Sequence, residues 1–131
     1  MSRPPSPRTL FAEPTHVPFA KTIHRLWGDD ESGKVPDWIY ISGEKIHQMI
    51  FKLAPGQAFQ HSENYRTYFA ADVVYAVLKG SIVMMNPETG EAQRAEAGET
   101  VFFRRDTWHH GFNDSTQVLE VLSQAVKQRR G

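Results

Sequence analysis

The chain has 131 residues, a length that one domain can fill around a single hydrophobic core. Lysine and arginine total 15, as do aspartate and glutamate, so the formal net charge of zero argues against general electrostatic attraction to nucleic acid or to an anionic membrane. The chain has no cysteine, which excludes disulfides, thiolate metal ligands and a cysteine nucleophile. Any metal must therefore be held by histidine nitrogens and oxygen ligands.

The N-terminal segment is rich in proline. Five of the eight prolines lie within residues 1–18, and proline disfavours both helices and central strands. We expect an extended arm here, either free in solution or laid across a partner subunit through Leu10 and Phe11. The start lacks the apolar core of a signal peptide, and no apolar run approaches the length of a membrane span, so a cytoplasmic location is expected.

The stretch "WGDDESGKVPDW" (27–38) is composed largely of turn-forming residues. We therefore predict an N-terminal arm and loop region over residues 1–38, a folded domain over residues 39–126 and a basic tail over residues 127–131. Neither the loop nor the tail carries a motif that suggests chemistry.

From Ile39 onward the sequence indicates short strands separated by turns. In "IHQMIFKL" (46–53) the residues alternate, with His47 on the same side as three apolar side chains. Further strand-like segments are "VVYAVLKG" (73–80), "SIVMMN" (81–86), "TVFFRR" (100–105) and "QVLEVLS" (117–123). No long amphipathic helix is present, so the pattern predicts an all-β domain, an antiparallel sandwich or barrel.

Polar side chains in the interior of such a barrel need a partner or a ligand, because their burial otherwise costs free energy. His61 and Glu63, in "FQHSEN", are two residues apart and project to the same side of an extended segment. A further histidine comes from "TWHHGF", where alternation allows only one of His109 and His110 to face inward. Two histidines and one carboxylate form the triad that holds iron or a related divalent metal with open positions.

The second of these segments matches a known motif. In "GETVFFRRDTWHHGFN", Gly98, His109 and Asn113 have the spacing of the second cupin motif, and Asp106 replaces its turn glycine. The first cupin motif is matched by Gly56, His61 and Gly80. The chain thus resembles the cupin superfamily, as a small single-domain member, over roughly residues 46–123.

The resemblance implies an antiparallel jelly-roll β-barrel and selects His109, not His110, as the inward residue. It implies a divalent metal, Fe²⁺ favoured and Mn²⁺, Ni²⁺ or Zn²⁺ possible, held by His61, Glu63 and His109. Two of the usual metal-ligand positions depart from the family pattern: Glu63 stands at the second histidine, and Val73 stands at the usual glutamate ligand. The alternatives are an oxygen ligand from Asp72 or a tyrosine, or a barrel that has lost its metal.

For function, the resemblance implies a metal-dependent enzyme acting on a small organic substrate. The reaction types to expect are dioxygenase, slightly favoured, then isomerase or epimerase, lyase and decarboxylase. The alternative is a non-catalytic cupin that binds a small ligand at a degenerate metal site. A homodimer paired through edge strands is also expected.

A third alternative is an enzyme without a cofactor, and its candidate catalytic groups for acid–base chemistry are Tyr68, His47 and Arg104. For His47 the alternative is a hydrogen-bonded interior histidine, and for Arg104 it is a solvated arginine at a strand end. An arginine that faced inward would bind a substrate carboxylate with two parallel hydrogen bonds.

Overall fold

The structure is a computed structural model, which describes residues 11–27, 34–60 and 71–127. Its elements are η1 (Phe19–Lys21), β1 (Ile23–Trp27), β2 (Val35–Ser42), β3 (Ile46–Leu53), β4 (Ala58–Gln60), β5 (Ala71–Lys79), β6 (Ser81–Met85), β7 (Ala92–Glu96), β8 (Thr100–Phe103), β9 (His110–Phe112) and β10 (Leu119–Lys127). Across these ranges, no helix is both long enough and apolar enough to cross a membrane.

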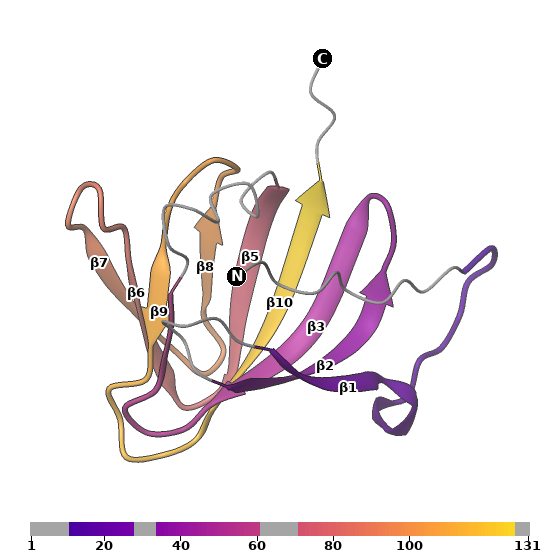
Figure 1. Ribbon diagram of the computed structural model, residues 1–131, viewed down its shortest axis with the longest axis horizontal. Coiled ribbons are helices and arrows are strands. Elements are labelled where there is room, and N and C mark those ends of the chain that lie inside the picture. The colour runs from indigo at the N-terminus through magenta and orange to yellow at the C-terminus, as the bar shows by residue number, and fades with distance from the viewer. Residues whose placement is uncertain (1–10, 28–33, 61–70, 128–131) are drawn as a thin grey trace.

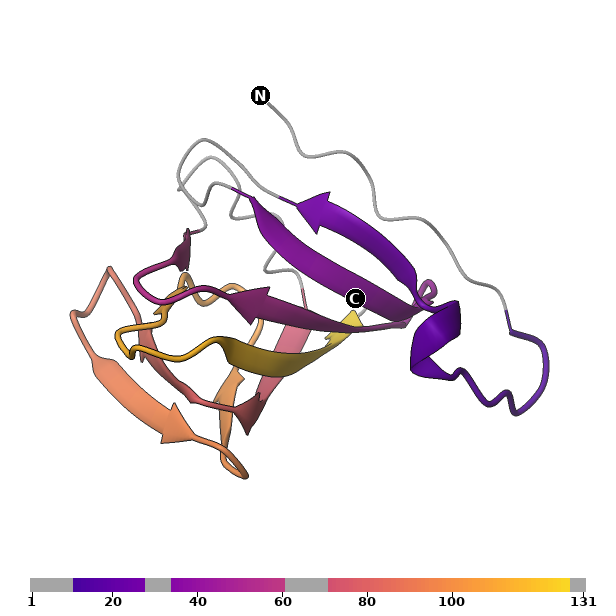
Figure 2. The same ribbon diagram turned by 90° about the horizontal axis from the view of Figure 1, so that it is seen from below.

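The strands form two antiparallel sheets. One has six strands in the order β1-β2-β3-β10-β5-β8, and the other has four in the order β4-β9-β6-β7. Figures 1 and 2 show the smaller sheet standing against one end of the larger sheet, while β1 and β2 extend the larger sheet beyond it. The predicted all-β jelly roll is confirmed.

The alternation predicted for residues 46–53 is also confirmed. Phe51 and Leu53 of β3 are buried in the core, and Met49 packs against it. The same period of two buries Val73 and Tyr75 on β5, so both point between the sheets. The core combines side chains of both sheets: Val35, Phe51, Leu53, Phe59, Val73, Tyr75, Val77, Ile82, Met84, Ala95, Val101, Leu119 and Val121.

The larger sheet begins earlier in the chain than the sequence predicted. The loop expected over residues 27–38 is wrong in its last part, because β2 starts at Val35 and buries Val35, Asp37 and Ile39 in alternation. Pro36 hides this pattern, but it precedes Asp37, the first residue paired with β3, and a proline is tolerated near the start of a strand. Asp37 also obscures the strand pattern, because an aspartate is buried only with a partner, and the sequence does not show which residue that partner is.

Gly111 marks the closest approach between β9 and the core. A Cβ atom built there would lie 2.2 Å from Cε2 of Phe59, far inside any real contact. We expect Gly111→Ala to destabilise the fold by about 2 kcal/mol, because the Phe59 ring must leave its packed position. Urea denaturation measures this, and Gly43→Ala is the control, since a Cβ atom built at Gly43 would meet the Ile46 carbonyl oxygen at an ordinary 3.7 Å and the residue has no positive φ. Equal stability of the wild type and Gly111→Ala contradicts the close packing.

Candidate site inside the barrel

His109 lies at the N-terminal side of β9 and is almost completely buried, at 1% exposure. A turn after β8 brings it there: the Thr107 amide donates to the Arg104 carbonyl at 3.2 Å, and Asp106 adopts a φ of 65°. Aspartate tolerates this left-handed conformation better than most residues. Asp106 therefore serves as the turn residue that the cupin motif fills with glycine.

The hydrogen bonds of His109 define which ring nitrogen carries the proton. Nδ1 lies 2.9 Å from the Thr107 carbonyl oxygen, which can only accept, so Nδ1 is the donor. Nε2 of the neutral ring is then an acceptor, and the Tyr75 hydroxyl donates to it at 2.7 Å. His109 and Tyr75 thus form a hydrogen-bonded pair across the barrel, from β9 and β5.

The surroundings of this pair are aromatic. The Phe103 ring stacks on the His109 ring, with 4.2 Å between centroids and 10° between planes, and Phe59 approaches edge-on at 6.3 Å. Burial lowers the pKa of the His109 imidazole to about 4; the hydrogen bond to the Thr107 carbonyl opposes this shift, and the neighbouring charge of His110 adds to it. His109 is therefore neutral at pH 7.

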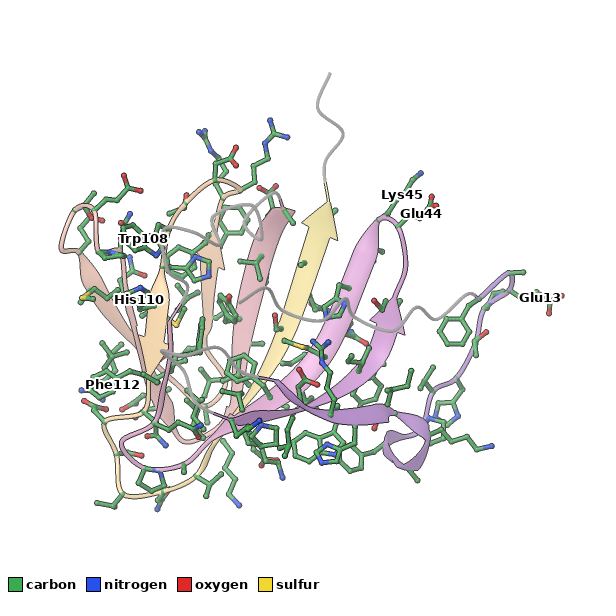
Figure 3. All side chains as sticks on the ribbon, in the orientation of Figure 1. Glu13, Glu44, Lys45, Trp108, His110 and Phe112 are labelled. Carbon is green, nitrogen blue, oxygen red and sulfur yellow. The ribbon has the colours of Figure 1, made fainter. Side chains whose placement is uncertain are left out.

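His110 faces the opposite way, as predicted. It is half-buried on the outer face of the smaller sheet, where its ring meets the edge of Trp108 at 5.7 Å between centroids. Figure 3 labels Trp108 just before β9, followed by His110 and Phe112 on the strand itself. The prediction that His109 points inward and His110 outward is confirmed.

Of the other predicted metal ligands, His61 and Glu63 lie outside the described residues, and so does the candidate catalytic Tyr68. His47 lies on the inner face of β3, half-buried, with Nδ1 3.2 Å from the Ser42 hydroxyl oxygen. Arg104 is exposed in the turn that follows β8. The structure therefore does not bring Arg104 to the buried pair.

Val73 and Asp72 lie on opposite faces of β5. Val73, at the family's glutamate position, is buried in the core. Asp72 faces outward, and its Oδ1 accepts a hydrogen bond from the Arg105 amide at 2.9 Å. Asp72 is thus directed away from His109, and no cluster of three potential ligands from histidine, cysteine, aspartate and glutamate occurs within the described ranges.

Two features of the interior do not follow from the sequence pattern. Tyr75 lies in the strand-like segment 73–80 and reads as core in the sequence, although a tyrosine on the inward side of an otherwise apolar strand signals a hydroxyl that needs a partner. The ion pair between Arg25 and Asp37, on β1 and β2, falls in the segment predicted to be arm and loop. Its only signal was a pair of opposite charges flanking a turn.

Comparison with solved structures finds proteins with a similar architecture. The polyketide cyclase RemF from Streptomyces resistomycificus has 16% identity and a TM-score of 0.70, covering 91% of this chain and 83% of that one. A predicted oxalate decarboxylase from Thermotoga maritima has 19% identity and a TM-score of 0.70, covering 87% and 100%. A cupin superfamily protein from Desulfitobacterium hafniense has 12% identity and a TM-score of 0.62, covering 76% and 84%.

These similarities define the fold. A six-stranded and a four-stranded antiparallel sheet closed around an aromatic core form a jelly-roll barrel. This jelly roll is the cupin superfamily fold, as the resemblance of the two motifs implied. No family model and no curated protein sequence matches the chain.

Proposed function

We propose that the protein is an enzyme that binds a small organic molecule inside the barrel and uses a divalent metal held by His109, His61 and Glu63. The observation that carries the proposal is the state of His109: a buried neutral imidazole whose Nδ1–H is held by a backbone carbonyl. A carbonyl on one ring nitrogen is the usual device that orients a metal-binding histidine. Neutral imidazole is also the form that binds metal.

The described part of the ligand set fits a metal in its donor chemistry, with one condition. The lone pair of His109 Nε2 accepts the Tyr75 hydrogen bond, so the Tyr75 side chain must move away from Nε2 before a metal can bind there. A bound metal would polarise a carbonyl or enolate oxygen of the substrate, or bind oxygen beside it, and a dioxygenase is slightly favoured. Around the site, the Phe103 and Phe59 rings exclude water, and Tyr75 can donate a hydrogen bond to a substrate oxygen.

Elemental analysis of protein purified without chelator tests this proposal. We expect stoichiometric metal in the wild type and its loss in His61→Ala and His109→Ala. His110→Ala is the matched control, because the adjacent histidine faces outward and should keep the metal. If the His109→Ala variant does not fold, His109→Gln takes its place. Metal-free wild type from medium supplemented with iron, manganese, nickel and zinc, or full metal content in a folded His109 variant, contradicts the proposal.

A second candidate function is favoured by the Tyr75–His109 hydrogen bond and by Val73 at the family's carboxylate position. In this case the barrel binds a small ligand without metal, and the Tyr75–His109 pair hydrogen-bonds to it. Tyr75→Phe separates the two candidates. The metal proposal expects this variant to retain its metal, since it loses only the competitor for Nε2, whereas the second candidate expects no metal and a loss of ligand binding.

We further propose that the protein acts as a cytoplasmic homodimer. The edge strands of the two sheets, β1 and β8 in one and β4 and β7 in the other, offer unpaired backbone groups in the described part of the chain. Leu26 on β1 and Phe102 on β8 are also well exposed apolar residues. Pairing of edge strands between two copies would cover both the unpaired backbone groups and these apolar side chains. Light scattering on the purified protein measures its mass in solution and so tests the dimer.

A further inference from the structure

A second polar group lies on the inner face of the larger sheet. Arg25 of β1 pairs directly with Asp37 of β2, and Asp37 pairs with Phe51 of β3. Directly paired residues of antiparallel strands point to the same side, so all three face the interior. Phe51 in turn meets Tyr75 edge-on, with 6.1 Å between ring centroids. Phe51 therefore lies between the Arg25–Asp37 pair and the Tyr75–His109 pair.

The geometry of this ion pair leaves most of the arginine unused. Nε of Arg25 lies 3.0 Å from both Oδ1 and Oδ2 of Asp37, so one nitrogen donates to both oxygens. Guanidinium carries five N–H donors, four of them on the two Nη nitrogens. No other hydrogen bond joins Arg25 to a described residue. The Nη edge, which matches a carboxylate in shape, is left over.

Burial of the Arg25–Asp37 pair costs desolvation free energy. Asp37 is 1% exposed and the Arg25 side chain 16% exposed. Desolvation of such a pair can exceed the attraction within it, so a buried pair is weak evidence of stabilisation alone. Asp37 holds the Nε edge and thereby fixes the direction of the fork, which is how an arginine is prepared for a second anion.

We infer that Arg25 binds the carboxylate of the molecule that the barrel takes, and that Phe51 contacts the body of that molecule. The ligand class is then a small carboxylic acid with an aromatic or unsaturated body, lying between Arg25 and the Tyr75–His109 pair. The inference rests on the proposed binding of a small molecule inside the barrel, but it does not depend on a metal.

The test uses benzoate and cinnamate as probes, with benzamide and cinnamamide as neutral analogues of the same shape. Binding is measured by ligand-observed NMR and by calorimetry. We expect the wild type to prefer each acid over its amide, and Arg25→Met to weaken the acids at least tenfold while leaving the amides unchanged. Arg25→Lys keeps the charge without the fork and should retain part of the preference. Arg94→Met is the matched control, since Arg94 also pairs with an aspartate, Asp114, but on exposed β7.

The variants must fold for the result to count, and Arg25→Met takes the guanidinium away from the buried Asp37 carboxylate. The double variant Arg25→Met/Asp37→Asn removes both charges and should fold while losing the preference for acids. The inference is overturned if the wild type binds neither acid, if it binds acid and amide equally, or if either folded variant binds the acids as the wild type does. Metal content, measured on the same samples, is expected to be unchanged by Arg25→Met. Metal-free protein that still prefers the acids through Arg25 would sink the metal proposal alone.

Discussion

Asn113→Ala is expected to destabilise the protein by about 4 kcal/mol, roughly twice the loss expected of Gly111→Ala. Asn113 is completely buried, at 0% exposure, and its amide uses every hydrogen-bonding position. Nδ2 donates to the carbonyls of Leu53 and Gln117 at 3.0 and 2.7 Å. Oδ1 accepts from the amide and hydroxyl of Ser115 at 3.0 and 2.7 Å. Alanine removes all four bonds at once from a completely buried position.

Urea denaturation gives the size of the effect. Asn86→Ala is the matched control, because Asn86 lies in an exposed turn and its Oδ1 accepts only the Glu88 amide there. We expect the control to lose less than about 1 kcal/mol. A loss in Asn113→Ala no larger than that of the control would mean that the bonds around residue 113 do not hold the end of β3 to the chain after β9.

The second large effect is a loss of stability as the pH falls, caused by His109 in the metal-free protein. The pKa of His109 is about 4 in the folded state and 6.5 in the unfolded state, so folding favours the neutral ring. The contribution of the neutral His109 ring to the free energy of unfolding is fully present above pH 6.5. It is lost progressively between pH 6.5 and 4 and does not change further below pH 4. A difference of this size corresponds to about 3 kcal/mol.

Comparison with a variant separates the contribution of His109 to stability from that of carboxylates, which titrate in a neighbouring pH range. We expect the stability of the wild type, measured by urea denaturation in the presence of chelator, to fall more steeply between pH 6.5 and 4 than that of His109→Gln. His110→Ala should follow the wild type, because its His109 is intact. Parallel curves for the wild type and His109→Gln would show that the imidazole is not held neutral by burial.

The sequence allowed the prediction of the fold and of the residue at the centre of the site. Motif spacing distinguished His109 from His110, and the period of two located β3 and β5. Both signals are local, since they depend only on which side of a strand a residue occupies.

What the sequence could not reveal depends on partners across the sheets. Arg25 and Asp37 each look like solvated charges until β1 and β2 pair and place them together on a buried face. Tyr75 looks like core until β9 brings His109 within 2.7 Å of its hydroxyl. His61 and Glu63, the remaining members of the predicted triad, lie outside the described residues, so the triad itself stays a prediction.

The early start of the larger sheet has a consequence for trimming the chain. Removing residues 1–38 as a dispensable arm would delete β1 and the first half of β2, and it would take away the β2 partners of Ile50 and Phe51 on β3. The hydrogen-bonding edge of this part of β3 would then be left unpaired and could associate with other chains. A cut at residue 10 instead leaves every described strand in place, together with the Arg25–Asp37 pair. The boundary between tail and domain thus lies before β1, at least a dozen residues earlier than proline and glycine content indicates.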